Sequence, residues 1–115
     1  LACFVLILGV LFGVFEHQLE KELESANERF PRFHSPHEGW AVLREEYDEL
    51  EEEVHQLDGE INCYLWGSVK RNTTADNVEA IRLRAIAAAC EAIQVAAMAQ
   101  KYLNMLERME KEESE

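Results

Sequence analysis

FHSPHEGWAVLREEYDELEEEV, residues 33–54, is the stretch that decides how this chain folds. Ser35 can accept a hydrogen bond from the first helical turn, Pro36 has no N–H that would need a partner there, and Glu38 can reach back to complete a capping box. The spacing predicts a helix from Pro36 to about Asp58, with a break or kink at Gly59. Its apolar stripe recurs in steps of three and four: Trp40, Leu43, Tyr47, Leu50, Val54, Leu57 and Ile61.

The carboxylates of this helix are not equivalent. At about 100° per residue, Glu46, Glu49 and Glu53 share a strip along the edge of the apolar stripe. Glu45 and Glu52 point away from it. Because like charges one turn apart repel each other, Glu46 and Glu49 need a counter-charge, and hard cations such as Mg²⁺ take carboxylate oxygens. The pattern predicts a metal site. The alternative interpretation is an acidic helix face that is exposed to solvent and has no ligand.

The rest of the chain also has helical patterns and no strand pattern. Residues 16–29 are polar with apolar positions at i,i+4 spacing, and they are expected to form a first helix that continues residues 1–15. Residues 30–34 and 67–76 are expected to be loops. A second capping box, Asp76 to Glu79, opens an alanine-rich helix that is expected to run from about Asn77 to Glu110, with one stripe of Ile86, Cys90, Ile93 and Ala97. The expected fold class is all-α, an antiparallel helical bundle whose core is completed by oligomerisation.

Length and charge narrow the function classes. A chain of 115 residues is expected to form one domain at most, with a shallow core. A formal net charge of -12 argues against binding to the nucleic-acid backbone or to anionic lipid. Three widely spaced cysteines without a CxxC pair are typical of reduced thiols in an intracellular protein. No basic surface or disulfide framework is expected.

Residues 1–15 form a nearly continuous apolar run that is shorter than the roughly 20 residues of a membrane span. Three interpretations stay open: the end of a membrane anchor, an apolar helix packed in an oligomer, or a segment appended at a gene boundary. We therefore divide the chain into residues 1–15, a helical domain at 16–112, and an acidic tail at 113–115.

Glu45-Glu46-x-x-Glu49 resembles the EExxE signature of the MazG-like, all-α nucleotide pyrophosphohydrolases. The segment 33–36 resembles the lead into that helix, and residues 91–98 resemble the second metal-binding helix of phage-type members. The resemblance covers roughly residues 16–110. It implies that Mg²⁺ is held by Glu46, Glu49, Glu91 and the residue three positions later. That residue is Gln94, where an Asp is usual, and the interval from Glu49 to Glu91 is longer than the family commonly shows.

The resemblance implies hydrolysis of a nucleoside triphosphate to the monophosphate and pyrophosphate in the cytoplasm of a bacterial or phage-infected cell. Glu45 or Glu53 would orient or deprotonate the attacking water. Before the acidic helix, His34, His37 and Trp40 are candidates for substrate contact, although Trp40 is also a natural core residue. Two other functions stay open: an acidic helical interaction module, tethered to a membrane if residues 1–15 are an anchor, and a family member that binds nucleotides without turnover. Five cations could meet the distal phosphates, but in an acidic chain such residues mostly form surface ion pairs, and the sequence does not choose among them: Lys70, Arg71, Arg82, Arg84 and Lys101.

Overall fold

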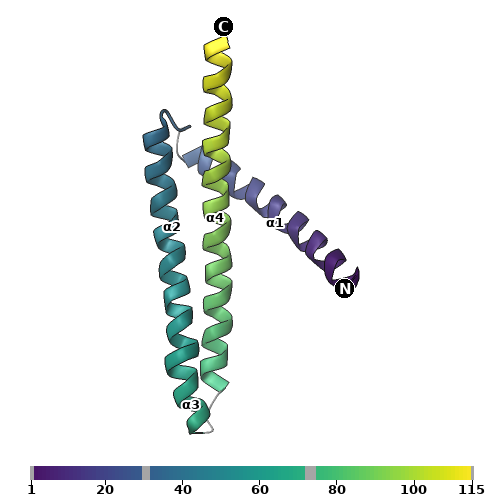
Figure 1. Cartoon of the computed structure of the whole chain (residues 1–115), viewed down its shortest axis with the longest axis vertical. Coiled ribbons are helices and arrows are strands. Elements are labelled where there is room, and N and C mark those ends of the chain that lie inside the picture. The colour runs from purple at the N-terminus through teal and green to yellow at the C-terminus, as the bar shows by residue number, and fades with distance from the viewer. Residues whose placement is uncertain (1, 30–31, 72–74, 115) are drawn as a thin grey trace. The chain divides into compact units, whose positions relative to one another are not determined.

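The computed structural model of this protein describes residues 2–29, 32–71 and 75–114. Three long helices dominate these residues: α1 (Ala2–Arg29), α2 (Pro36–Gly59) and α4 (Ala75–Ser114) (Figure 1). A π-helix, η1 (Glu60–Leu65), and the short α3 (Trp66–Lys70) follow α2. No strand occurs in the part of the chain that is described, which confirms the all-α fold class. Among the same residues, no helix combines the length and the apolar character needed to cross a bilayer.

The chain divides into two compact units, and both α2 and α4 contribute to each of them. The first unit comprises Leu1–Leu43 and Ile93–Glu115, and the second unit comprises Arg44–Ala92. In the second unit, the later part of α2 and the early part of α4 run antiparallel as the arms of a helical hairpin (Figure 1). The acidic stretch and Glu91 both belong to this hairpin.

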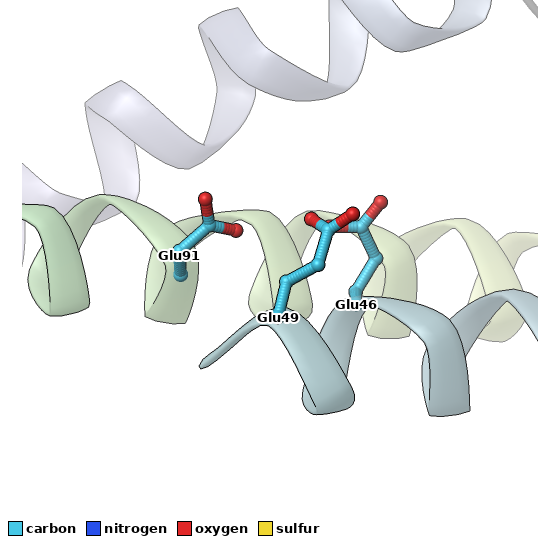
Figure 2. Close-up of side chains that lie close together, drawn as sticks. All are labelled: Glu46, Glu49 and Glu91. Carbon is cyan, nitrogen blue, oxygen red and sulfur yellow. The ribbon is translucent and has the colours of Figure 1, made fainter. Parts of the chain in front are cut away.

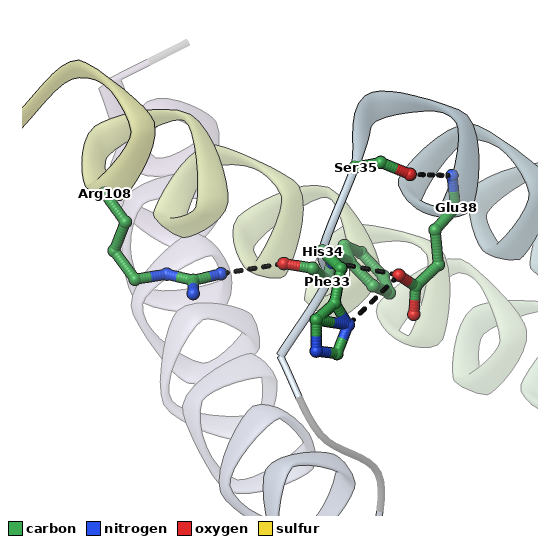
Figure 3. Close-up of polar contacts among 5 residues, drawn as sticks. All are labelled: Phe33, His34, Ser35, Glu38 and Arg108. Atoms are coloured by element: carbon green, nitrogen blue, oxygen red, sulfur yellow. Dashed lines mark hydrogen bonds and ion pairs between the residues drawn. The ribbon is translucent and has the colours of Figure 1, made fainter. Parts of the chain in front are cut away.

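The start of α2 follows the sequence prediction closely. The helix begins at Pro36, and the Ser35 hydroxyl accepts a hydrogen bond from the backbone N–H of Glu38 at 3.2 Å. The Glu38 carboxylate reaches one residue further back than a capping box requires, and it accepts a bond from the N–H of His34 at 2.9 Å (Figure 3). Its oxygen also lies 3.4 Å from Nδ1 of His34. Glu38 therefore fixes the segment that leads into α2.

Phe33 anchors this lead segment in the core of the first unit, where its side chain is only 3% exposed. The Arg108 guanidinium donates a hydrogen bond to the Phe33 carbonyl at 2.9 Å (Figure 3). The Lys101 ammonium lies 4.7 Å from the centre of the Phe33 ring, a cation–π contact. The buried apolar residues of this core are Ala26, Phe33, Ala97, Met98 and Met105. The lead segment is thus held by packing as well as by polar contacts.

The second unit lacks such a core. Among its described side chains, none that is apolar is buried. The predicted apolar stripe of α2 divides: Leu50 and Leu57 are half-buried, whereas Tyr47, Val54 and Ile61 are exposed. In the first unit, Trp40 is 65% exposed, so it does not pack in the core, which was the alternative to substrate contact. The stripe of α4 behaves similarly, being exposed at Ile86 and Cys90 and fully buried only from Ala97.

Three boundaries differ from the sequence expectation. Gly59 does not break the helix, because its φ of -61° and ψ of -43° are helical and the chain continues into η1. Residues 67–70, expected to be a loop, belong to α3. The last helix begins at Ala75 and ends at Ser114, so it is longer at both ends than expected. The expected loop residues 30–31 and 72–74, and the Asp76 side chain of the second capping box, lie outside what the structure describes.

Candidate metal centre

Three glutamates converge within the second unit. Glu46 and Glu49 project from α2 and Glu91 projects from α4, so that the hairpin brings them face to face (Figure 2). One carboxylate oxygen from each residue lies within 4.8 Å of the others. Glu46 and Glu91 are half-buried, and Glu49 is exposed. We call these three residues the glutamate cluster.

The cluster is electrostatically strained without a counter-ion. Burial raises the pKa of Glu46 above its ordinary value, and the neighbouring charges of Glu49, Glu91 and Glu45 raise it further. Burial also raises the pKa of Glu91, with added contributions from Glu49 and Glu53. Both shifts mean that the charged carboxylate is less favourable here than in water, because desolvation and like charges penalise it. A cation placed between the three groups would remove this penalty.

The residues fit a hard divalent cation. Carboxylate oxygens are the ligands that Mg²⁺ prefers, so Glu46, Glu49 and Glu91 would hold the ion, and the ion would neutralise their charges. Oε2 of Glu91 is buried, and no group in the described residues donates a hydrogen bond to it. Buried acceptors are normally satisfied. A cation would therefore give this oxygen the partner that it lacks among the described residues.

Glu53 lies one turn of α2 after Glu49, and we call Glu46, Glu49 and Glu53 the acidic row. Glu53 also lies near a cation, Arg84. Its Oε2 lies 3.8 Å from Nη1 of Arg84 on α4, too long for a hydrogen bond, and this buried oxygen accepts none from the described residues. Glu53 is half-buried, and Arg84 is partly exposed. The other glutamate predicted to act on water, Glu45, is exposed and contributes to the raised pKa of Glu46.

Gln94, which the resemblance places among the metal ligands, belongs to the first unit. Its amide nitrogen donates a hydrogen bond of 2.7 Å to the Glu22 carboxylate of α1. This bond uses the donor end of the amide. The structure thus brings together three of the four predicted ligands and gives the fourth a partner on α1.

The predicted substrate residues also lie in the first unit, around the start of α2. His34 is exposed and paired with Glu38, and His37 is exposed. Trp40 presents its indole to solvent. All three side chains are therefore accessible to a ligand.

Arg84 lies beside the site, although the sequence did not distinguish it from the other cations of the chain. A signal for it exists in the spacing, because Arg84 precedes Glu91 by seven residues, or two helical turns, and so lies on the same face of α4. The pairing of α4 with α2 that brings it to Glu53 is a tertiary contact, which that spacing alone does not reveal.

The comparisons with known proteins add no relative: no family model, no curated protein and no solved structure matches this chain.

Proposed function

We propose that this chain is a Mg²⁺-dependent nucleoside triphosphate pyrophosphohydrolase of the MazG-like type, which converts a nucleoside triphosphate and water to the monophosphate and pyrophosphate. The observation that carries the proposal is the convergence of Glu46, Glu49 and Glu91 around one point, with a buried Oε2 on Glu91 that has no donor among the described residues. The EExxE spacing, which resembles that of this family, supplies the reaction class. Cytoplasmic location in a bacterial or phage-infected cell belongs to the same proposal.

The positions of the side chains support a role for each of them. The glutamate cluster would hold Mg²⁺, which supplies charge neutralisation for the phosphates and lowers the pKa of a bound water. Glu53, half-buried one turn after Glu49, is better placed than the exposed Glu45 to accept a proton from the attacking water. Gln94 stays a proposed ligand through its amide oxygen, since its bond to Glu22 uses only the amide nitrogen. His34, His37 and Trp40 remain proposed substrate contacts.

A pyrophosphate-release screen across the common NTPs and dNTPs tests the proposal. We expect release with at least one substrate in millimolar Mg²⁺, with the monophosphate formed in equal amount and the signal lost on chelation. Orthophosphate as the released product, or release that persists in chelator, would contradict the reaction class.

A second candidate, a non-catalytic helical interaction module, is favoured by one observation: the exposed apolar side chains of the second unit. It predicts partner binding with no turnover in the same screen. A nucleotide-binding protein without turnover, motivated by Gln94, would bind substrate in Mg²⁺ and release no pyrophosphate. Measuring nucleotide binding as well as pyrophosphate release for the same substrates separates the three functions.

A further inference from the structure

We infer that Arg84 binds the phosphate chain of the substrate beside the glutamate cluster. The inference rests on the proposed function and names a residue outside both the EExxE signature and residues 91–98, the segment that resembles the second metal-binding helix. It follows from three observations on the second unit: where the cations lie, how each of them is paired, and how far Arg84 lies from Glu91.

Most cations of the second unit are engaged elsewhere. Arg82 makes two hydrogen bonds to the Glu79 carboxylate, at 2.6 and 3.0 Å. Arg44 pairs with Asp48 at 3.1 Å and also lies over the Tyr47 ring. Lys70 lies over the Trp66 ring, and the Arg71 guanidinium folds against Gly67 at the closed end of the hairpin. Arg84 differs from these residues because its partner belongs to the acidic row.

The pairing of Arg84 is loose. Its Nη1 lies 3.8 Å from Oε2 of Glu53, and that oxygen accepts no hydrogen bond from the described residues. A guanidinium can form two parallel, charge-assisted hydrogen bonds to a phosphate. Exchanging one long contact with Glu53 for such a pair would be favourable. The side chain of Arg84 is 40% exposed, so an incoming phosphate can reach it.

The distance between Arg84 and the glutamate cluster suits a chain of phosphates. Arg84 and Glu91 lie on one face of α4, and their Cα atoms are separated by about 10.5 Å along the helix axis. The flexible arginine side chain spans part of that separation. A triphosphate bound at the glutamate cluster through one phosphate can therefore present another to the guanidinium. Arg84 would also supply positive charge beside the acidic residues, which otherwise repel a polyanion.

Calorimetric binding of inorganic tripolyphosphate to the full chain in millimolar Mg²⁺ tests the inference. We expect the parent protein to bind in a Mg²⁺-dependent manner and Arg84→Ala to bind roughly ten- to hundredfold more weakly, the cost of losing charged hydrogen bonds. Arg84→Gln, which keeps a polar end group but removes the charge, should show the same loss. Arg82→Ala removes the same charge two residues away, on another face, and should bind like the parent.

Titration with Mg²⁺ alone separates a phosphate ligand from a structural residue. Without Arg84, the glutamate cluster is more negative, so Arg84→Gln should bind Mg²⁺ at least as tightly as the parent. Parental tripolyphosphate affinity in Arg84→Gln would overturn the inference and leave the proposed function standing. Weakened binding of Mg²⁺ alone would also overturn it, since the residue would then act through the fold. A parent that fails to bind tripolyphosphate in Mg²⁺ would also overturn the inference, and the pyrophosphate-release screen then decides the proposed function separately.

Discussion

At the scale of single residues, two carboxyl groups of the site lie in surroundings that disfavour their charged form. Glu46 and Glu91 are half-buried and face other acids, and burial raises the pKa of each, assisted by Glu49. A fold that keeps such groups together without a ligand sacrifices stability. The strain therefore supports a binding role for these residues.

The raised pKa values predict an unusual pH dependence for the metal-free protein. Since both folded-state pKa values exceed the unfolded ones, their stabilising contribution is fully present below the ordinary glutamate pKa and is lost as pH rises through the folded values. Metal-free protein should therefore melt at a lower temperature at pH 8 than at mildly acidic pH. Glu91→Gln should raise the melting temperature at pH 8, modestly because solvent screens the partly exposed group.

The control for this pH experiment is Glu51→Gln, which removes an exposed charge from α2 outside the glutamate cluster. It should keep the parental pH profile. Thermal melts across the pH range in chelator provide the comparison. Identical profiles for the parent and Glu91→Gln would show that the glutamate cluster carries no such strain.

The sequence predicts only part of this residue-level arrangement. The strip of Glu46 and Glu49 follows from helical spacing, because residues three apart on a helix are neighbours. Glu91 enters through the resemblance. The bond from Gln94 to Glu22 joins residues 72 positions apart, and it depends on how α1 packs in the first unit. Local patterns contain no information on such a pairing.

At the scale of elements, the ends of α2 show what is local and what is not. Its start was predictable because Ser35, Pro36 and Glu38 act through bonds to their near neighbours. The buried face of α2 was not predictable, because an apolar stripe becomes buried only where another element covers it. Leu50 and Leu57 are half-buried, whereas Tyr47 and Val54, on the same predicted stripe, face solvent.

Two glycines of α2 should respond in opposite ways to the same substitution. A Cβ at Gly39 would meet the Tyr102 ring, with Cε2 only 2.7 Å away, whereas a Cβ at Gly59 meets no atom within 4 Å. Gly59→Ala should stabilise the protein by about 0.5–1 kcal/mol, since alanine loses less conformational entropy in a helix. Gly39→Ala should destabilise it by roughly 1–3 kcal/mol through overpacking.

Urea unfolding followed by circular dichroism measures both substitutions under one condition. Each variant serves as the control for the other, because the chemical change is the same and both sites lie in α2. Equal free energies of unfolding for the two variants would mean that Gly39 does not provide the close approach of Tyr102 to α2.

At the scale of the whole molecule, the all-α class was predictable because every periodic segment has a helical period, and oligomerisation stays a proposal. The second unit supports it, because this unit exposes many large apolar side chains and, within its described residues, buries none. Two antiparallel helices from each of two copies would form a four-helix bundle. The exposed side chains are Tyr47, Val54, Ile61, Tyr64, Trp66, Val69, Val78, Leu83 and Ile86.

We propose that a second copy covers the exposed strip of Tyr47, Val54 and Ile61, whose spacing of seven places all three on one face. Light scattering at micromolar concentration should show a dimer or larger oligomer. Val54→Glu should shift it towards monomer, because a charge would be buried in the interface. His55→Glu adds the same acid at the next, exposed position and should behave like the parent. A folded, monomeric parent would contradict the proposal.

The most direct test of the central claim is Mg²⁺-dependent pyrophosphate release by three proteins, on the substrate found in the screen: the parent, Glu49→Ala and Glu51→Ala. Glu49 belongs to the glutamate cluster, and Glu51 is an exposed acid on the same helix. We predict that Glu51→Ala retains parental activity and that Glu49→Ala, although folded, loses it and no longer responds to Mg²⁺. Equal activity in the two variants would contradict the assignment of hydrolysis to this cluster.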